Sequence, residues 1–198
     1  MGREFELKYA ATEAQLALLQ GQFPRCVPIA METTYYDTPD GAFGRLRWTL
    51  RRRIENGQSV CSVKLPLPDG SRGEWETEEA DIEKAIPRLC ALGAPEDLPR
   101  LTAGGVVESC GARFTRLACT VALRDATVEL ALDRGVFLGG GRELPFAEVE
   151  VELKEGSEAA AVAFAEALAE EFSLKPEPRS KVARARALAD LRGGQNPI

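Results

Sequence analysis

Polar and apolar residues alternate along much of the chain, and this pattern predicts β-strands because successive side chains of a strand point to opposite faces. Eight strands are expected, at about 3–9, 31–37, 46–54, 59–65, 72–78, 113–123, 126–133 and 146–154. Turn-forming residues gather in the short segments 55–58, 66–70, 124–125 and 139–141. Strands joined by tight hairpins are antiparallel, so the sequence predicts a mainly antiparallel sheet.

Helical patterns occur between and after these strands, at about 12–23, 81–92, 157–172 and 180–192. Thr12 and Gln15 have the spacing of a capping box at the start of the first helix. Pro87 should kink or shorten the second helix, because proline lacks the N–H of a helical hydrogen bond. The chain therefore predicts a single α+β domain over 1–198, with a flexible C-terminal tail at about 193–198.

The first and last strands, and one more strand before the last, carry acidic residues on one face and apolar residues on the other. The acids on these faces are Glu4, Glu6, Asp133, Glu148, Glu150 and Glu152. Lys8 shares the face of Glu4 and Glu6. Carboxylates at such spacing repel each other, so they must lie apart, pair with cations or bind a metal.

The middle strands carry most of the basic residues. Those that share a face with other charged or polar residues are Arg47, Arg51, Arg53, Lys64, Arg72 and Arg116, accompanied by Thr49, Glu74 and Glu76. Two interpretations stay open: a half-buried sheet with its polar face in water, or a charged interior that binds anions. The sorting by sign and the number of arginines favour the second, because arginine recognises phosphate with two parallel hydrogen bonds. Arg184 and Arg186, on the last expected helix, are predicted to lie on a solvated face.

Composition excludes several classes of protein. The chain has 198 residues and a net charge of −6, which argues against nonspecific nucleic-acid binding. It has no histidine, so histidine-based catalysis is excluded. Its five cysteines include no C-x-x-C pair, and we expect reduced cytoplasmic thiols rather than a disulfide framework or a zinc cluster. No signal peptide or transmembrane stretch is predicted.

The charged motifs, taken in their order along the chain, resemble those of the CYTH superfamily, the triphosphate tunnel metalloenzymes. The E-x-E-x-K signature of that family is similar to Glu4, Glu6 and Lys8. The other matching elements are Tyr35-Tyr36-Asp37-Thr38-Pro39, Leu50-Arg51-Arg52-Arg53, Lys64, Arg72 with Glu74 and Glu76, Arg116, Asp133, the Glu148, Glu150 and Glu152 repeat, and Ser180-Lys181. Each element is short, but nine in the same order are specific.

The resemblance implies a closed eight-stranded antiparallel β-barrel, the triphosphate tunnel, with charged side chains inside and helices packed outside. It implies catalytic roles for Glu4, Glu6, Lys8 and Glu150, substrate contacts from Lys8, Arg51, Arg53, Lys64, Arg116 and Lys181, and a Mg²⁺ or Mn²⁺ site formed by Glu4, Glu6, Asp133, Glu148 and Glu150. Lys8 next to acids is expected to stay protonated and to contact phosphate. The roles of Arg47, Arg52 and Glu152 stay open.

The function implied by the resemblance is metal-dependent hydrolysis of a small-molecule triphosphate. Inorganic tripolyphosphate is the expected substrate because the sequence shows no aromatic slot for an organic group. Thiamine triphosphatase, class IV adenylate cyclase and a noncatalytic polyphosphate or nucleotide binder are the alternatives. No nucleic-acid or membrane partner is expected, and a homodimer stays open.

Overall fold

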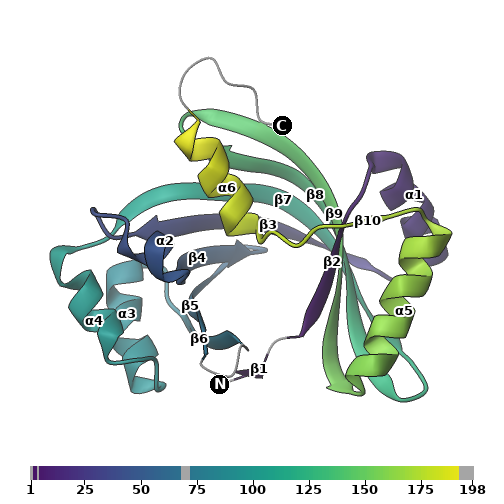
Figure 1. Cartoon of the computed structure of the whole chain (residues 1–198), viewed down its shortest axis with the longest axis horizontal. Coiled ribbons are helices and arrows are strands. Elements are labelled where there is room, and N and C mark those ends of the chain that lie inside the picture. Colours follow the sequence, from purple (N-terminus) through teal and green to yellow (C-terminus); the bar gives the residue numbers. More distant parts are fainter. Residues whose placement is uncertain (1, 4, 68–71, 192–198) are drawn as a thin grey trace.

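The computed structural model describes residues 2–3, 5–67 and 72–191, so Glu4 and the predicted tail at about 193–198 lie outside the described residues. One antiparallel sheet carries helices on both of its sides (Figure 1). The strands are β1 (Gly2–Arg3), β2 (Glu6–Ala10), β3 (Val27–Asp37), β4 (Thr49–Glu55), β5 (Gln58–Pro66), β6 (Arg72–Glu78), β7 (Val107–Ala122), β8 (Ala126–Gly139), β9 (Arg142–Gly156) and β10 (Lys175–Pro176).

Hydrogen bonds place the strands in the order β1-β6-β5-β4-β3-β7-β8-β9-β2-β10, and each pairing is antiparallel. The predicted hairpins are confirmed by the pairs β4–β5, β5–β6, β7–β8 and β8–β9. The antiparallel α+β fold therefore follows the pattern of alternation and turns in the sequence.

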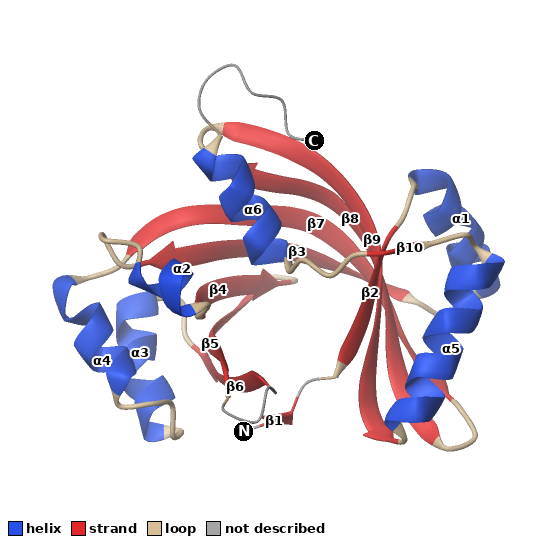
Figure 2. Ribbon diagram, viewed as in Figure 1, coloured by secondary structure: helices blue, strands red, loops and turns tan. Residues whose placement is uncertain are grey.

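The prediction of a closed eight-stranded barrel is wrong in two respects. Within the part of the chain that the structure describes, the sheet has ten strands, because the two-residue strands β1 and β10 join eight longer ones. It is also open, since β1 and β10 end the order and the described residues of these strands do not pair with each other. Strands β1 and β2 lie near opposite ends of the strand order, yet only residues 4–5 separate them in the sequence. The two ends of the sheet must therefore lie near each other, and the sheet curves into an arch (Figure 2). Alternation predicts local pairing, whereas closure depends on the twist accumulated over all strands.

Several strand boundaries differ from the prediction. Strand β7 begins at Val107 rather than at 113, because the small residues of 109–112 hide the alternation. The predicted strand 46–54 begins only at Thr49. Before it lies a short helix, α2 (Ala42–Leu46), followed by Arg47 with a left-handed backbone, φ 59°. Arg47 is exposed and does not share the face of Arg51.

The predicted helices are present, and two short ones were missed. The helices are α1 (Glu13–Gln22), α2, α3 (Ile82–Ala91), α4 (Asp97–Leu101), α5 (Glu158–Glu171) and α6 (Lys181–Asp190), with a 3₁₀ turn at Thr102–Gly104. The capping box is confirmed, since Thr12 Oγ1 accepts from Gln15 N at 3.2 Å and Gln15 Oε1 accepts from Thr12 N at 2.8 Å. Pro87 lies inside α3 and does not shorten it. No helix of the described residues is both long and apolar enough to cross a membrane.

Two apolar cores lie on the outer face of the arch, under helices. Strands β4–β6 pack against α3 and α4 through buried residues that include Leu50, Trp75 and Leu89. Strands β2, β8 and β9 pack against α1 and α5 through residues such as Val149 and Leu168. Trp48 and Trp75 both belong to the first of these cores.

Helix α6 contradicts the prediction that helices pack outside. Its residues Val182, Ala185 and Leu188 form a third core with Phe114 and Phe137, which lie on the same strand faces as Arg116 and Asp133. The helix therefore lies on the concave side of the arch, below β7, β8 and β9 (Figure 1). A broad apolar helix pattern predicts burial but does not identify the face of the sheet that buries it.

The prediction that the cysteines are reduced thiols is wrong for one pair. Cys26 and Cys119 form a disulfide, with Cα atoms 4.3 Å apart. The pairing of Val27 with Ala118 aligns these two residues across β3 and β7, although 93 positions separate them in the sequence. Cys61, Cys90 and Cys110 are free.

Candidate active site

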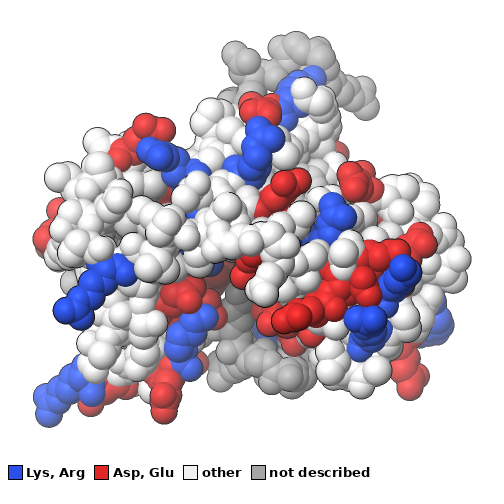
Figure 3. Space-filling view, turned by 180° about the vertical axis from the view of Figure 1, so that it is seen from behind, with Lys and Arg blue, Asp and Glu red and all other residues white. Residues whose placement is uncertain are grey.

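A cavity of about 360 Å³ lies on the concave side of the arch. Its walls are the inward faces of strands β2 to β9 and the start of α6. The basic lining residues are Lys8, Arg51, Arg53, Lys64, Arg72, Arg116, Lys154 and Lys181, and the acidic ones are Glu6, Glu55, Glu74, Glu76, Glu129, Glu150 and Glu152. Seen from behind, charged side chains border the hollow between the part of the molecule that contains α3 and α4 and the part that contains α1 and α5 (Figure 3). The charged strand faces therefore point inward, and the interpretation of a polar face in water is wrong.

The structure brings most of the predicted site residues together. Those that line the cavity are Glu6, Lys8, Arg51, Arg53, Lys64, Arg116, Glu150 and Lys181. Asp133 and Glu148 lie beside the cavity and are fully buried. Glu4 lies outside the described residues.

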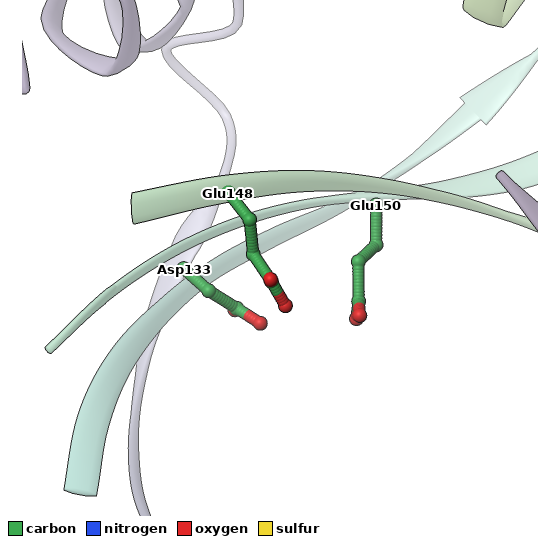
Figure 4. A group of neighbouring side chains, drawn as sticks. All are labelled: Asp133, Glu148 and Glu150. Atoms are coloured by element: carbon green, nitrogen blue, oxygen red, sulfur yellow. The ribbon is translucent and has the colours of Figure 1, made fainter. Parts of the chain in front are cut away.

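Three of the predicted metal ligands form a compact group. Asp133 on β8 and Glu148 and Glu150 on β9 extend to the same side of two adjacent strands (Figure 4). Each offers a carboxylate oxygen, and these oxygens lie within 4.8 Å of one another. We call these three residues the acidic cage. Their convergence follows from register, since Asp133 pairs with Glu148 and Glu150 is the next residue on the same face.

Lys181, the first residue of α6, places its ammonium in the acidic cage. Its Nζ lies 2.8 Å from Asp133 Oδ2 and 2.8 Å from Glu150 Oε1, and it also pairs with Glu148 Oε1. A lysine ammonium has three N–H donors. That of Lys181 donates to Glu150 Oε1 and forms ion pairs with all three carboxylates. In this arrangement Lys181 is a counter-ion of the cage.

Two arginines complete the neutralisation of the cage. Arg116 on β7 donates from Nε and Nη2 to the two carboxylate oxygens of Asp133, at 2.8 Å each, and also pairs with Glu150. Arg184 pairs with Glu148, and its guanidinium lies 4.6 Å from the centroid of the Phe137 ring. The prediction of a solvated Arg184 is wrong, since only 9% of its side chain is exposed.

The prediction of a solvated Arg186, on the same helix, is also wrong. Its Nη2 lies 3.3 Å from Asp37 Oδ2, and 21% of its side chain is exposed. Asp37 also accepts from the backbone N–H groups of Thr38, Phe43 and Gly44 at the start of α2. Arg186 therefore joins α6 to α2 rather than facing water.

The cage changes the pKa values of its members. Burial alone would raise the pKa of Glu150, but Lys181 and Arg116 outweigh burial and hold it well below its usual range. Burial would likewise lower the pKa of Lys181, but Glu150 and Asp133 raise it overall. For Arg184 burial prevails and lowers the pKa to about 10. Glu150 and Lys181 are therefore both charged at neutral pH.

The opposite wall, on β4 to β6, also carries basic residues that pair with acids. Arg51 Nη2 and Lys64 Nζ share the two oxygens of Glu74, at 3.2 Å and 3.1 Å. Arg53 Nε lies 2.5 Å from Glu55 Oε1 at the end of the same strand. Glu74 therefore spaces two cations along one side of the cavity.

Carboxylates also line the cavity beyond the cage. Glu6 on β2 lies opposite Glu152 on β9, and Glu152 lies opposite Glu129 on β8. Lys154 pairs with Glu152 at 2.9 Å and with Glu129 at 3.8 Å, whereas Glu6 pairs with Lys8 at 3.1 Å. This acidic row lies next to Glu150 on the cavity wall.

Some lining residues were missed as site residues by the sequence reasoning. The sequence indicates a charged strand face formed by Arg72, Glu74 and Glu76 but assigns it no role. The register of β6 with β5 places all three residues in the cavity. Uncharged residues of β3 and β7, such as Tyr35, Met31 and Phe114, also line it. Only their alternation could have indicated an inward position, because apolar residues are the usual content of a core.

The fold and the cavity together define a class of domain: a strongly curved antiparallel sheet that surrounds a cavity of paired acids and bases. The CYTH domain model matches residues 2–185. The chain therefore belongs to the CYTH domain family.

Comparison with known proteins agrees with this membership. An inorganic triphosphatase of Haemophilus influenzae is 30% identical over 129 residues, which are 63% of this chain and 36% of that protein. The chain thus spans only about a third of the length of this curated relative.

Two solved structures show the same fold. One is a Hippeastrum protein studied as an adenylyl cyclase and found to have a dominant triphosphatase activity; it has 21% identity, a TM-score of 0.64, and coverage of 93% of this chain and 95% of its own. The other is a Bacillus halodurans protein named as an adenylate cyclase, with 18% identity, a TM-score of 0.64, and coverage of 91% and 96%.

Proposed function

We propose that this protein is a divalent-metal-dependent triphosphatase that hydrolyses inorganic tripolyphosphate to pyrophosphate and orthophosphate. The observation that carries the proposal is the cavity of about 360 Å³, which among the described residues is lined by eight basic and seven acidic side chains. The triphosphatase relative from Haemophilus influenzae supports the same activity. The reaction consumes one water, whose oxygen bonds to the terminal phosphorus while the bond to the bridging oxygen of pyrophosphate breaks.

The basic wall of β4 to β6 would hold the phosphate chain. Arg51, Arg53, Lys64 and Arg72 all line this side of the cavity. Tripolyphosphate carries roughly four to five negative charges at neutral pH, given a terminal pKa near 6. Glu74 holds Arg51 and Lys64 in place until phosphate oxygens replace its own as hydrogen-bond acceptors. Lys8 would contact the phosphate from the opposite side, next to Glu6.

Carboxylates that line the cavity fit a divalent cation. Glu6, Glu150 and Glu152 are neighbours by strand register, and all three line the cavity. Oxygen ligands of this kind suit Mg²⁺ or Mn²⁺. When bound, such an ion neutralises phosphate charge and makes water a better nucleophile. Of the predicted ligands, Glu6 and Glu150 belong to this group, whereas Asp133 and Glu148 pair with Lys181, Arg116 and Arg184, and Glu4 lies outside the described residues.

A substrate panel tests the proposal. Metal-free protein is supplied with Mg²⁺ or Mn²⁺ and with tripolyphosphate, thiamine triphosphate or ATP, and orthophosphate, pyrophosphate and cyclic AMP are measured. We expect orthophosphate from tripolyphosphate, loss of turnover with a chelator, and recovery when the ion is restored. Preference for thiamine triphosphate, or formation of cyclic AMP, would assign one of the alternative activities. Tight binding of tripolyphosphate without turnover of any substrate would indicate a noncatalytic binder.

A further inference from the structure

Among the described residues, the three carboxylates of the acidic cage meet three cationic side chains, from Arg116, Lys181 and Arg184, which balance them without any added ion. Two of these cations also lie near a further carboxylate, Arg116 at 3.9 Å from Glu129 and Arg184 at 4.0 Å from Glu177. The group is also shielded from water, since Asp133 and Glu148 have no exposed side-chain surface and Lys181 has 12%. A divalent cation added to this balanced group would leave two uncompensated positive charges in a buried place, which is strongly unfavourable.

Of these three cations, only Lys181 lies at the end of an element, since Arg116 is in β7 and Arg184 lies inside α6. It is the first residue of α6, directly after the N-cap Ser180, and both residues line the cavity. The rest of α6 is fixed separately, by the core around Val182, Ala185 and Leu188. The long side chain of Lys181 can therefore leave the carboxylates by rotation about its own bonds while the helix stays packed.

We propose that Lys181 is a built-in cation that competes with divalent metal ions for the carboxylates of the acidic cage. Its ammonium occupies the position between the three carboxylates, and a divalent ion that binds Glu150 from the cavity displaces it. The displaced ammonium regains its three donors, which become available to a phosphate oxygen. Metal binding and the release of Lys181 toward substrate are thus one event.

This inference rests on the divalent-cation site of the proposed function, but it is tested by ion binding and labelling rather than by turnover. Mn²⁺ binding to metal-free protein is measured by calorimetry and by electron paramagnetic resonance, for the wild type and for Lys181→Met. Lys84→Met is the matched control, because it removes the same charge from an exposed side chain on α3. An absence of triphosphate turnover would overturn the proposed function and leave this measurement unaffected.

With its competitor removed, Lys181→Met should bind Mn²⁺ about tenfold more tightly than the wild type, or bind one further ion. Lys84→Met should bind Mn²⁺ as the wild type does. Adding Glu148→Gln to Lys181→Met should reverse the gain, because it removes a carboxylate of the cage. Equal affinity and equal stoichiometry in Lys181→Met and the wild type would overturn the proposal.

A second measurement uses the wild-type protein and does not depend on how the variants fold. Lysines are acetylated with acetic anhydride at low conversion, with and without saturating Mn²⁺, and the sites are quantified by peptide mass spectrometry. Lys181 should react several-fold faster when Mn²⁺ is bound, because its ammonium has left the carboxylates, whereas the reactivity of Lys84 should stay constant. Unchanged or lower reactivity of Lys181 with Mn²⁺ would contradict the displacement.

Discussion

At the scale of single residues, Arg51 and Arg52 show how strand alternation separates two identical side chains. Arg51 faces the cavity, where Nε donates to Ser62 Oγ at 2.9 Å and Nη2 pairs with Glu74. Arg52, the next residue of β4, faces the outside and donates to the carbonyl of Ala80 at 3.4 Å. The two residues are therefore a matched pair for testing the cavity as the active site.

Arg51→Ala should lower kcat/KM for tripolyphosphate by about 10- to 100-fold, because it removes charge-assisted hydrogen bonds to phosphate. Arg52→Ala should change kcat/KM by less than about twofold, since its side chain points away from the cavity. Steady-state kinetics at saturating metal measure both. Equal losses in the two variants would mean that the cavity wall of β4 is not the phosphate site.

Glu177 gives a prediction of pH dependence. Hydrogen bonds from Arg179, whose Nη2 lies 2.9 Å from Glu177 Oε2, hold the pKa of Glu177 below its usual range. The ionised carboxylate therefore stabilises the folded state above an unfolded pKa of about 4.3, and this stability is lost as the pH falls toward the lower, folded pKa. Because Arg179 is largely exposed, the contribution should be less than about 1 kcal/mol.

Glu177→Gln should accordingly have a lower free energy of unfolding than the wild type at pH 7, and the difference should shrink below about pH 4. Urea denaturation across this range, with Glu171→Gln at an exposed position as the control, measures it. A difference that stays constant with pH would show that ionisation of Glu177 is not its cause.

At the scale of elements, α6 depends on a glycine of the sheet for its close approach. A Cβ at Gly139, the last residue of β8, would lie 2.7 Å from both Ala185 O and Ala189 N of the helix. Backbone atoms cannot yield as a flexible side chain could, so the helix itself would have to shift. The position of Lys181 over the acidic cage thus depends on a glycine that contacts α6 further along the helix, at Ala185 and Ala189.

Gly139→Ala should lower the free energy of unfolding by about 1–3 kcal/mol, as overpacking does in cores. Gly21→Ala is the control, because Gly21 lies in α1 with nothing within 4 Å of its added Cβ, and it should be neutral or stabilising by up to about 1 kcal/mol. Chemical denaturation compares the two variants. Equal stability of Gly139→Ala and the wild type would contradict the close packing of α6 on β8.

At the scale of the whole molecule, the disulfide joins two parts of the chain that the sheet also joins. Cys26 precedes β3 and Cys119 lies in β7, and the bond closes a loop across 93 positions of sequence. Cross-linking distant residues restricts the unfolded chain more than the folded one. The disulfide should therefore stabilise the arch near its centre, where β3 and β7 pair.

Reduction should lower the free energy of unfolding by about 2–4 kcal/mol, and Cys26→Ser should show the same loss without reductant. Cys90→Ser is the control, because Cys90 is a free thiol on α3. Thermal unfolding with and without reductant measures all three proteins. An unfolding midpoint of the wild type that does not respond to reductant would show that the bond does not contribute.

The sequence alone determined most of the fold and much of the site. Alternation and turn residues gave the antiparallel strands, and the order of charged motifs gave the family. Glu6, Lys8, Arg51, Lys64 and Glu150, which line the cavity, were predicted as site residues by the resemblance to the CYTH family, and the strand period indicated which of these side chains share a face. These features depend on residues close in sequence, where local chemistry sets the backbone.

Only the tertiary structure decided which face of the sheet is interior, whether the sheet closes, and where α6 packs. Alternation distinguishes the two faces of a sheet but does not say which face is interior. The cavity exists because the arch brings β2 and β9 opposite β4 and β5. The contact of Lys181 with Asp133, Glu148 and Glu150 joins residues more than 30 positions apart. No local pattern encodes such a contact, because it depends on the curvature and register of the whole sheet.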